Sequence, residues 1–134
     1  MTKGQAVYVE SIGSGANLIG YTRRYAATAS TANYTAPAAN TAGTVTLAAA
    51  SALYNVIGQV FYSYSASPTN GSLVIKDGTS NVVLNLDVTA AGANCFTFTP
   101  PMKATATNKV MSVVLAAGGE SVAGKLMVVS WTEA

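Results

Sequence analysis

Hydrophobic and polar positions alternate along most of the chain beyond residue 44. The clearest case is residues 71–88, GSLVIKDGTSNVVLNLDV, where two alternating segments flank a five-residue polar turn at 77–81. Side chains of a β-strand point to opposite faces in turn, so this pattern predicts a β-hairpin with one buried face. The predicted inner-face positions of the hairpin are Leu73, Ile75, Val82, Leu84, Leu86 and Val88.

Further apolar runs recur between turn signals, with the spacing of an all-β domain. They predict strands over 44–49, 54–66, 95–100, 109–118 and 124–133, with a turn at TPPM, 99–102. The best helix candidate is 47–58, but its β-branched and aromatic residues favour a strand preceded by a loop. We therefore expect an all-β fold, a single antiparallel β-sandwich over residues 44–134. It is either a jelly roll or immunoglobulin-like, because periodicity does not show which strands pair.

Residues 1–43 differ in character and predict an extended N-terminal arm. AVYVES and NLIGYTRRY each fit a short strand, but residues 26–43 are small and polar without a period. A structureless stretch of this length is uncommon inside a compact domain and often serves as a functional loop. The arm grips a neighbouring subunit, covers its own sandwich or acts as a linker. For the first case, the candidate interface residues are Tyr21, Arg23, Arg24, Tyr25 and Tyr34.

The composition indicates a surface suited to contact with other subunits. Charged residues make up 9% of the 134 residues, against about 25% in an average soluble protein. Few charges remain to protect sheet edges and exposed faces, so we expect a homo-oligomer. The net charge of +2 is too small to indicate a nucleic-acid partner. No apolar run reaches the roughly 18 residues of a membrane span, and the N-terminus lacks the apolar core of a signal peptide.

Groups for catalysis or metal binding are scarce. The chain has no histidine, and no two of its five carboxylates are spaced like a paired acid and base. Asp77 and Asp87 are expected to be solvated. A turn explains Asp77-Gly78 better than a calcium site shared with Asn81 does. Cys95, the single cysteine, is expected to be a small buried thiol. We expect neither an enzyme nor a bound metal or cofactor.

The aromatic run VFYSYS at 60–65 leaves two interpretations open. Alternation places Tyr62 and Tyr64 on one face, where their rings could stack on a sugar with help from Trp131. Packing between strands of the sandwich is the favoured interpretation, with Trp131 as a core or interface cap.

Several segments within residues 56–131 carry a resemblance to a known group of proteins: a strand ending in Ser-Ala, then GSLVIKDG, FTFTPPM, NKVMSVVLAAGG and AGKLMVVSW. In these segments the chain resembles the small β-sandwich proteins of tailed-bacteriophage virions. The resemblance implies a non-enzymatic capsid decoration (cement) protein or a head appendage. Such a protein is made in the host cytoplasm, is often trimeric, and binds the major capsid protein on the capsid exterior. The alternatives are a fibre or tail component and a carbohydrate-binding module.

Overall fold

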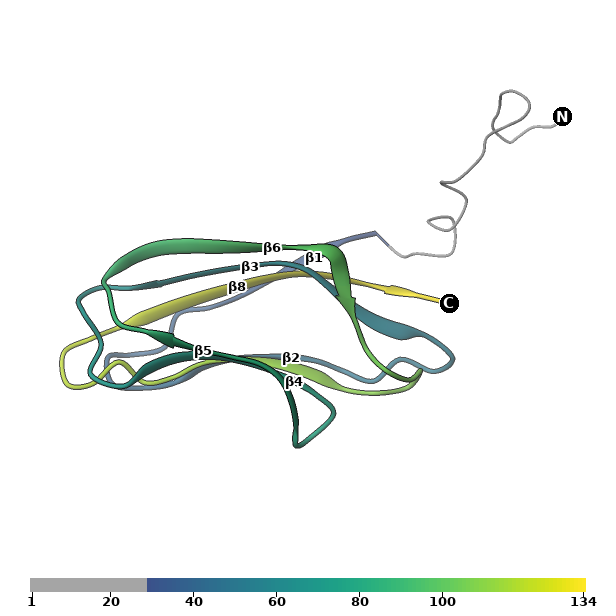
Figure 1. The fold of residues 1–134 in the computed structure, drawn as a ribbon, viewed down its shortest axis with the longest axis horizontal. Coiled ribbons are helices and arrows are strands. Elements are labelled where there is room, and N and C mark those ends of the chain that lie inside the picture. Colours follow the sequence, from purple (N-terminus) through teal and green to yellow (C-terminus); the bar gives the residue numbers. More distant parts are fainter. Residues whose placement is uncertain (1–28) are drawn as a thin grey trace, which may run out of the picture.

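Eight β-strands and no helix make up the part of the chain that the computed structural model describes, residues 29–134 (Figure 1). The strands predicted between residues 44 and 133 are all present, and the predicted loop before residue 54 is confirmed. The short strands predicted in AVYVES and NLIGYTRRY lie outside the described residues. The strands are β1 (Thr31–Thr35), β2 (Gly43–Leu47), β3 (Tyr54–Tyr64), β4 (Gly71–Asp77), β5 (Asn81–Val88), β6 (Gly92–Lys103), β7 (Met111–Leu115) and β8 (Gly124–Glu133).

The strands form two four-stranded antiparallel sheets that pack face to face (Figure 1). One sheet has the order β1-β8-β3-β6 and the other the order β2-β7-β4-β5. The first strand therefore pairs with the last, β2 with β7, β3 with β6 and β4 with β5. This is the path of one long hairpin wound across two sheets, which is the topology of a jelly roll. The predicted β-sandwich is confirmed, and the pairing decides between the two topologies that the sequence left open.

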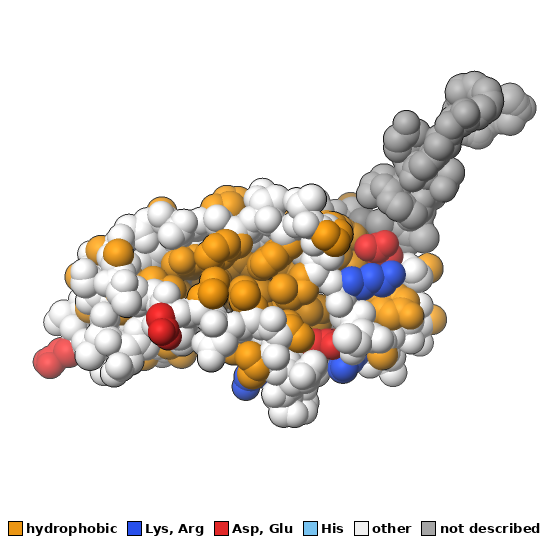
Figure 2. Space-filling model, in the orientation of Figure 1, with side chains coloured by type: hydrophobic (Ala, Val, Ile, Leu, Met, Phe, Trp, Pro, Cys, Tyr) orange, Lys and Arg blue, Asp and Glu red, His pale blue; other side chains and the backbone are white. Residues whose placement is uncertain are grey.

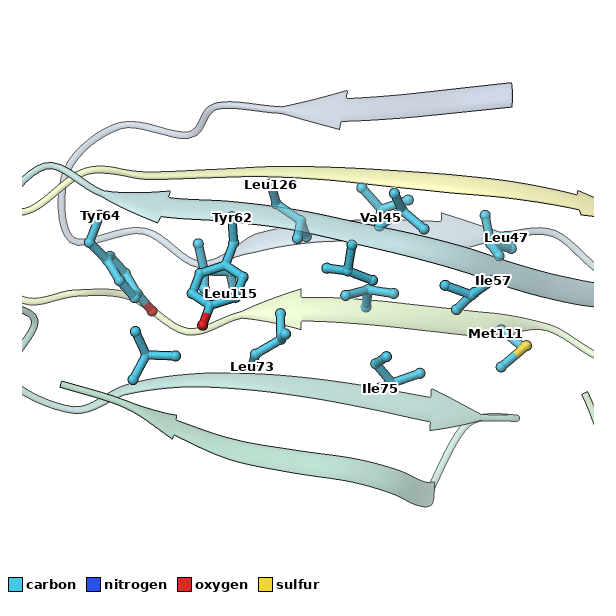
Figure 3. Packing of buried hydrophobic residues seen from close by; sticks show 14 of the residues in the cluster. Val45, Leu47, Ile57, Tyr62, Tyr64, Leu73, Ile75, Met111, Leu115 and Leu126 are labelled. Atoms are coloured by element: carbon cyan, nitrogen blue, oxygen red, sulfur yellow. The ribbon is translucent and has the colours of Figure 1, made fainter. Parts of the chain in front are cut away.

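Inward-facing side chains of both sheets fill the space between them (Figure 3). The alternation is regular in β2, where Val45 and Leu47 are buried and Thr44 and Thr46 are exposed. The largest fully buried apolar side chains include Ile57, Leu73, Ile75, Met111, Leu115 and Leu126. Burying a side chain of this size stabilises the fold by about 1.5 to 3 kcal/mol, so this alternation is the main source of stability.

The predicted extent of the arm is wrong in its last part. Thr31–Thr35 form β1, which pairs with β8 at the edge of the first sheet. The core-facing positions of β1 are Thr31, Asn33 and Thr35, which lie beside inward-facing residues of β8. Because these side chains are polar, the sequence of β1 shows no alternation of apolar and polar residues that would predict a strand. Tyr21, Arg23, Arg24 and Tyr25 lie outside the described residues, so the arm assignment of these four stays a prediction.

Two further differences follow from irregular strands. The TPPM segment lies within β6 instead of forming a turn, and an edge strand tolerates its two prolines. In the hairpin, a bulge shifts the register between Ile75 and Lys76, so Val82 pairs with the outward-facing Lys76. Val82 is 49% exposed instead of lying on the inner face, whereas Leu84 and Leu86 remain partly buried.

A candidate interaction surface on the outer face of one sheet

A continuous row of apolar side chains crosses the outer face of the β1-β8-β3-β6 sheet. The strand register places Tyr34 beside Met127, Met127 beside Phe61, and Phe61 beside Cys95, so the row contains one residue from each strand. Tyr34 is 61% exposed, and Met127 and Phe61 are half-buried. We call these four residues the apolar row. Neither inward-facing alternation nor composition reveals this row, because it depends on which strands are neighbours.

The surroundings of the apolar row carry little charge. The next row along the sheet consists of Ala32, Val129, Gln59 and Thr97. There the Gln59 amide donates a hydrogen bond of 3.1 Å to the Thr97 hydroxyl. The charged residues of this face are Lys125 near one end of the sheet, and Lys103 and Glu133 near the other. The centre of the face can therefore be covered by another protein without burying an unpaired charge.

Trp131 closes one end of this surface. Its indole lies against Gly58, where a Cβ atom would come within 2.6 Å of the ring. The register between β3 and both neighbouring strands shifts at this glycine, which marks a bulge. Val56, the register partner of Trp131, is fully buried although it is outside the main core cluster. The half-buried Trp131 thus packs on the backbone of β3 at this end of the surface, and its assignment as a core or interface cap stays a prediction.

Tyr62 and Tyr64 do not form a ligand face, because both point into the sandwich (Figure 3). They are 7% and 2% exposed, and Tyr62 stacks on Phe96 with ring centroids 6.0 Å apart. The Tyr64 hydroxyl donates a hydrogen bond of 2.6 Å to the carbonyl oxygen of Ala116. Burial raises the pKa of the Tyr64 phenol above its ordinary value. The sugar-stacking alternative therefore loses these two residues, and packing between strands is confirmed.

Asp77 is buried, so the prediction that it is solvated is wrong. Its carboxylate accepts hydrogen bonds from the Thr105 hydroxyl at 2.6 Å and from the Lys109 ammonium at 3.2 Å. Burial opposes ionisation, but these donors outweigh it and hold the pKa of Asp77 below its ordinary value. The cluster ties the 104–110 loop to the end of β4. These donors all bind Oδ2, whereas the buried Oδ1 has no hydrogen-bond partner among the described residues. Asp87 is exposed as predicted.

Asn55 is a second buried polar anchor, which sequence reasoning did not identify. It is 4% exposed, and its amide group donates hydrogen bonds to the carbonyl oxygens of Ala48 and Lys109, both at 2.9 Å. The side chain thereby joins β3 to the loop after β2 and to the segment just before β7. The local pattern, an asparagine inside an apolar strand, is the only sign of it in the sequence.

Cys95 is exposed instead of buried. It belongs to the edge strand β6 and pairs with Phe61, whose side chain faces outward, so its thiol lies on the outer face at the end of the apolar row. The side chains of this strand alternate between the two faces of the sheet as predicted, but Cys95 points to the outer face instead of the core. The thiol is a chemical marker for this surface.

The charge of the described residues sums to zero. Residues 29–134 contain Lys76, Lys103, Lys109 and Lys125, balanced by Asp77, Asp87, Glu120 and Glu133, so the net charge of +2 lies entirely in residues 1–28. A domain without net charge does not repel further copies of itself. Within residues 29–134, no group of three or more Asp, Glu or Cys side chains is placed to hold a metal ion. The same residues contain no helix that is long and apolar enough to cross a membrane.

Comparisons with known proteins leave the family of this chain open. No protein-family model matches the sequence, and no curated protein matches it. Among solved structures, one similar chain belongs to the virus-like particle of the extra small virus of the giant freshwater prawn, Macrobrachium rosenbergii. The TM-score is 0.31 at 11% identity, over 97% of this chain and 92% of the other. This likeness is too low to bear on the function of the chain.

Proposed function

We propose that this chain is a non-enzymatic structural protein of a virion, a capsid decoration protein that clamps neighbouring major capsid subunits. The observation that carries the proposal is the apolar row on a face with charge only near its ends. The resemblance of residues 56–131 to small phage virion proteins points the same way. Jelly rolls serve as capsid domains, although they also serve other functions, so the fold alone does not decide.

The outer face has a suitable size for this role. Four strands at a spacing of about 4.8 Å and a rise of about 3.3 Å per residue over some ten residues cover roughly 600 Å². A standard protein interface buries about 800 Å² per partner. One copy then binds its site with moderate strength, and several linked copies bind more firmly through avidity. The major capsid protein is the proposed partner, and the capsid exterior is the proposed location.

Residues 1–28 form a second proposed contact with the shell. They carry the whole net charge of +2 and contain Tyr21, Arg23, Arg24 and Tyr25. Aromatic and arginine side chains are the types most often found at the energetic centre of interfaces. Because β1 begins at Thr31, a truncation that tests this contact has to end at residue 28 and leave the sheet intact.

The test is co-sedimentation of the purified protein with undecorated phage heads. We expect binding to saturate at a copy number set by the symmetry of the head. Tyr34→Lys, which places a charge in the apolar row, should weaken binding at least tenfold. Thr46→Lys on the outer face of the other sheet is the matched control, because Thr46 is also exposed on a strand, and it should leave binding unchanged.

Labelling of Cys95 gives an independent readout of the same contact. Its thiol should react freely in the isolated protein and become protected on heads, because it lies at the end of the apolar row. Absence of binding by a folded protein would overturn the proposal in favour of a fibre or tail component. Binding that is equal for Tyr34→Lys and Thr46→Lys, with Cys95 still reactive, would overturn the assignment of the face.

A further inference from the structure

The two sheets of the jelly roll are closed on one side and open on the other. On the closed side, the edge strands β1 and β2 contact each other across the sheets, whereas β5 and β6 make no comparable contact on the opposite side. Figure 2 shows hydrophobic side chains gathered between β6 and β5. Leu84, Phe96, Phe98 and Met102 are the partly buried residues that pack there against the core. We call this region the open side.

Strand β5 is a weakly protected edge. It is the last strand of its sheet, so one row of its backbone N–H and C=O groups has no strand partner among the described residues. Proline, charges and bulges usually protect edge strands, but Asn81–Val88 contains no proline, one charged residue, Asp87, and the single bulge opposite Lys76. Val82 and Val83 are 49% and 41% exposed. Strand β6 differs, because Pro100 and Pro101 lack the N–H groups that strand pairing uses.

We propose that a second copy of this chain covers the open side, with the β5 strands of the two copies paired antiparallel about a two-fold axis. The pairing joins the two β2-β7-β4-β5 sheets into one eight-stranded sheet. The pairing also brings Val82 and Val83 of each copy into contact with the partner copy, and it covers the apolar opening between β5 and β6. The inference concerns a different surface from the apolar row and does not rest on the proposed virion function.

The charges beside β5 are complementary under this symmetry. Within one copy, Asp87 pairs with Ser72, whereas Lys76 pairs with Val82, so the two charges are about 13 Å apart along the sheet. Antiparallel pairing of β5 with its copy places Asp87 near the partner's Val82, and hence near the partner's Lys76. Both side chains lie on the outer face of the sheet. Each dimer therefore contains this ion pair twice, as a two-fold contact requires.

The area of the contact sets the expected affinity. The opening between the two sheets is about 10 Å wide, and the strands at its edges, β5 and β6, increase the width of the contact to about 20 Å. Over a length of about 30 Å, this contact covers roughly 600 Å² per copy. This is somewhat below the standard interface of about 800 Å² per partner, so we expect a dissociation constant in the micromolar range. The net charge of zero over residues 29–134 adds no repulsion. A two-fold contact gives a dimer, and the trimer that the family resemblance implies would need another surface.

The test is the molar mass of the full chain in solution, measured by sedimentation equilibrium from about 1 to 200 µM. We expect a monomer–dimer equilibrium. Val83→Lys should weaken dimerisation at least tenfold, because it places two ammonium groups in an apolar contact. The matched control is Thr46→Lys, since Thr46 is also an exposed residue of an edge strand, β2, at the opposite edge of the same sheet. It should dimerise like the wild type.

A charge swap tests the geometry itself. Asp87→Lys and Lys76→Glu should each weaken the dimer roughly tenfold, because two surface ion pairs become repulsive. The double variant should restore dimerisation. Both side chains are at least partly exposed, so the variants are expected to fold, and far-UV circular dichroism checks this.

A monomeric wild type at 200 µM, a trimer, or single variants that dimerise normally would each overturn the two-fold pairing. Failure of the double variant to restore the dimer would overturn the Asp87–Lys76 contact and with it the proposed register. No phage head enters these measurements, so the outcome is independent of head binding.

Discussion

Gly58→Ala tests the packing that supports the outer face. A Cβ atom at residue 58 would lie 2.6 Å from Cζ3 and 2.9 Å from Cη2 of Trp131. The optimal separation of non-bonded carbon atoms is about 3.5 to 4.0 Å, so the indole would have to move away from residue 58 by about 1 Å. Overpacking of this kind costs about 1 to 3 kcal/mol. The lower entropy of the unfolded alanine chain offsets about 0.4 to 1 kcal/mol of it. We expect a net loss of about 1 to 2 kcal/mol.

The assay is urea unfolding, followed by circular dichroism and by the fluorescence of Trp131, the single tryptophan. The emission of folded Gly58→Ala should shift to the red, because the displaced ring becomes more exposed. In a Trp131→Ala background, followed by circular dichroism alone, the substitution at Gly58 should cost almost nothing. This loss of coupling identifies the indole as the cause of the destabilisation.

Gly43→Ala is the matched control. Its Cβ atom would lie 3.4 Å from Pro37 and Thr35, which is an ordinary van der Waals distance. We expect no loss of stability, or a gain of a few tenths of a kcal/mol. The reasoning is refuted if Gly58→Ala unfolds with the same free energy as Gly43→Ala and its emission is unchanged.

Three further predictions concern single side chains. Asp77→Ala should cost about 1.5 to 3 kcal/mol, because Thr105 and Lys109 lose the carboxylate that accepts their hydrogen bonds. Since folding lowers the pKa of Asp77, its contribution is present above its unfolded pKa of about 4 and disappears at lower pH. The wild type should therefore lose stability as the pH falls below about 4, and Asp77→Ala should lose less. Tyr64→Phe should cost about 1 kcal/mol in urea unfolding, since the Ala116 carbonyl loses its donor; an unchanged midpoint contradicts the hydrogen bond. Cys95 should react with one equivalent of a thiol reagent in the folded protein, and a thiol that reacts only after unfolding contradicts the assigned face.

The sequence did not predict the burial of Asp77 or the exposure of Val82. Asp77 looks like an ordinary turn residue, because its partners Thr105 and Lys109 lie 28 and 32 positions along the chain. Val82 was assigned to the wrong face because one bulge reverses the alternation beyond it. In both cases the deciding contact is made with a segment that the local pattern does not contain.

The sequence by itself determined the all-β class and the positions of most strands. Strand β8 spans the predicted residues 124–133, and β3, β4, β5 and β7 fall within their predicted ranges. The reason is that alternation of buried and exposed side chains is a local property with a period of two residues. The same pattern does not record which strand lies beside which. Pairing of β1 with β8 and of β3 with β6 produced the jelly roll, the apolar row and the open side, because these depend on neighbours that are distant in the chain.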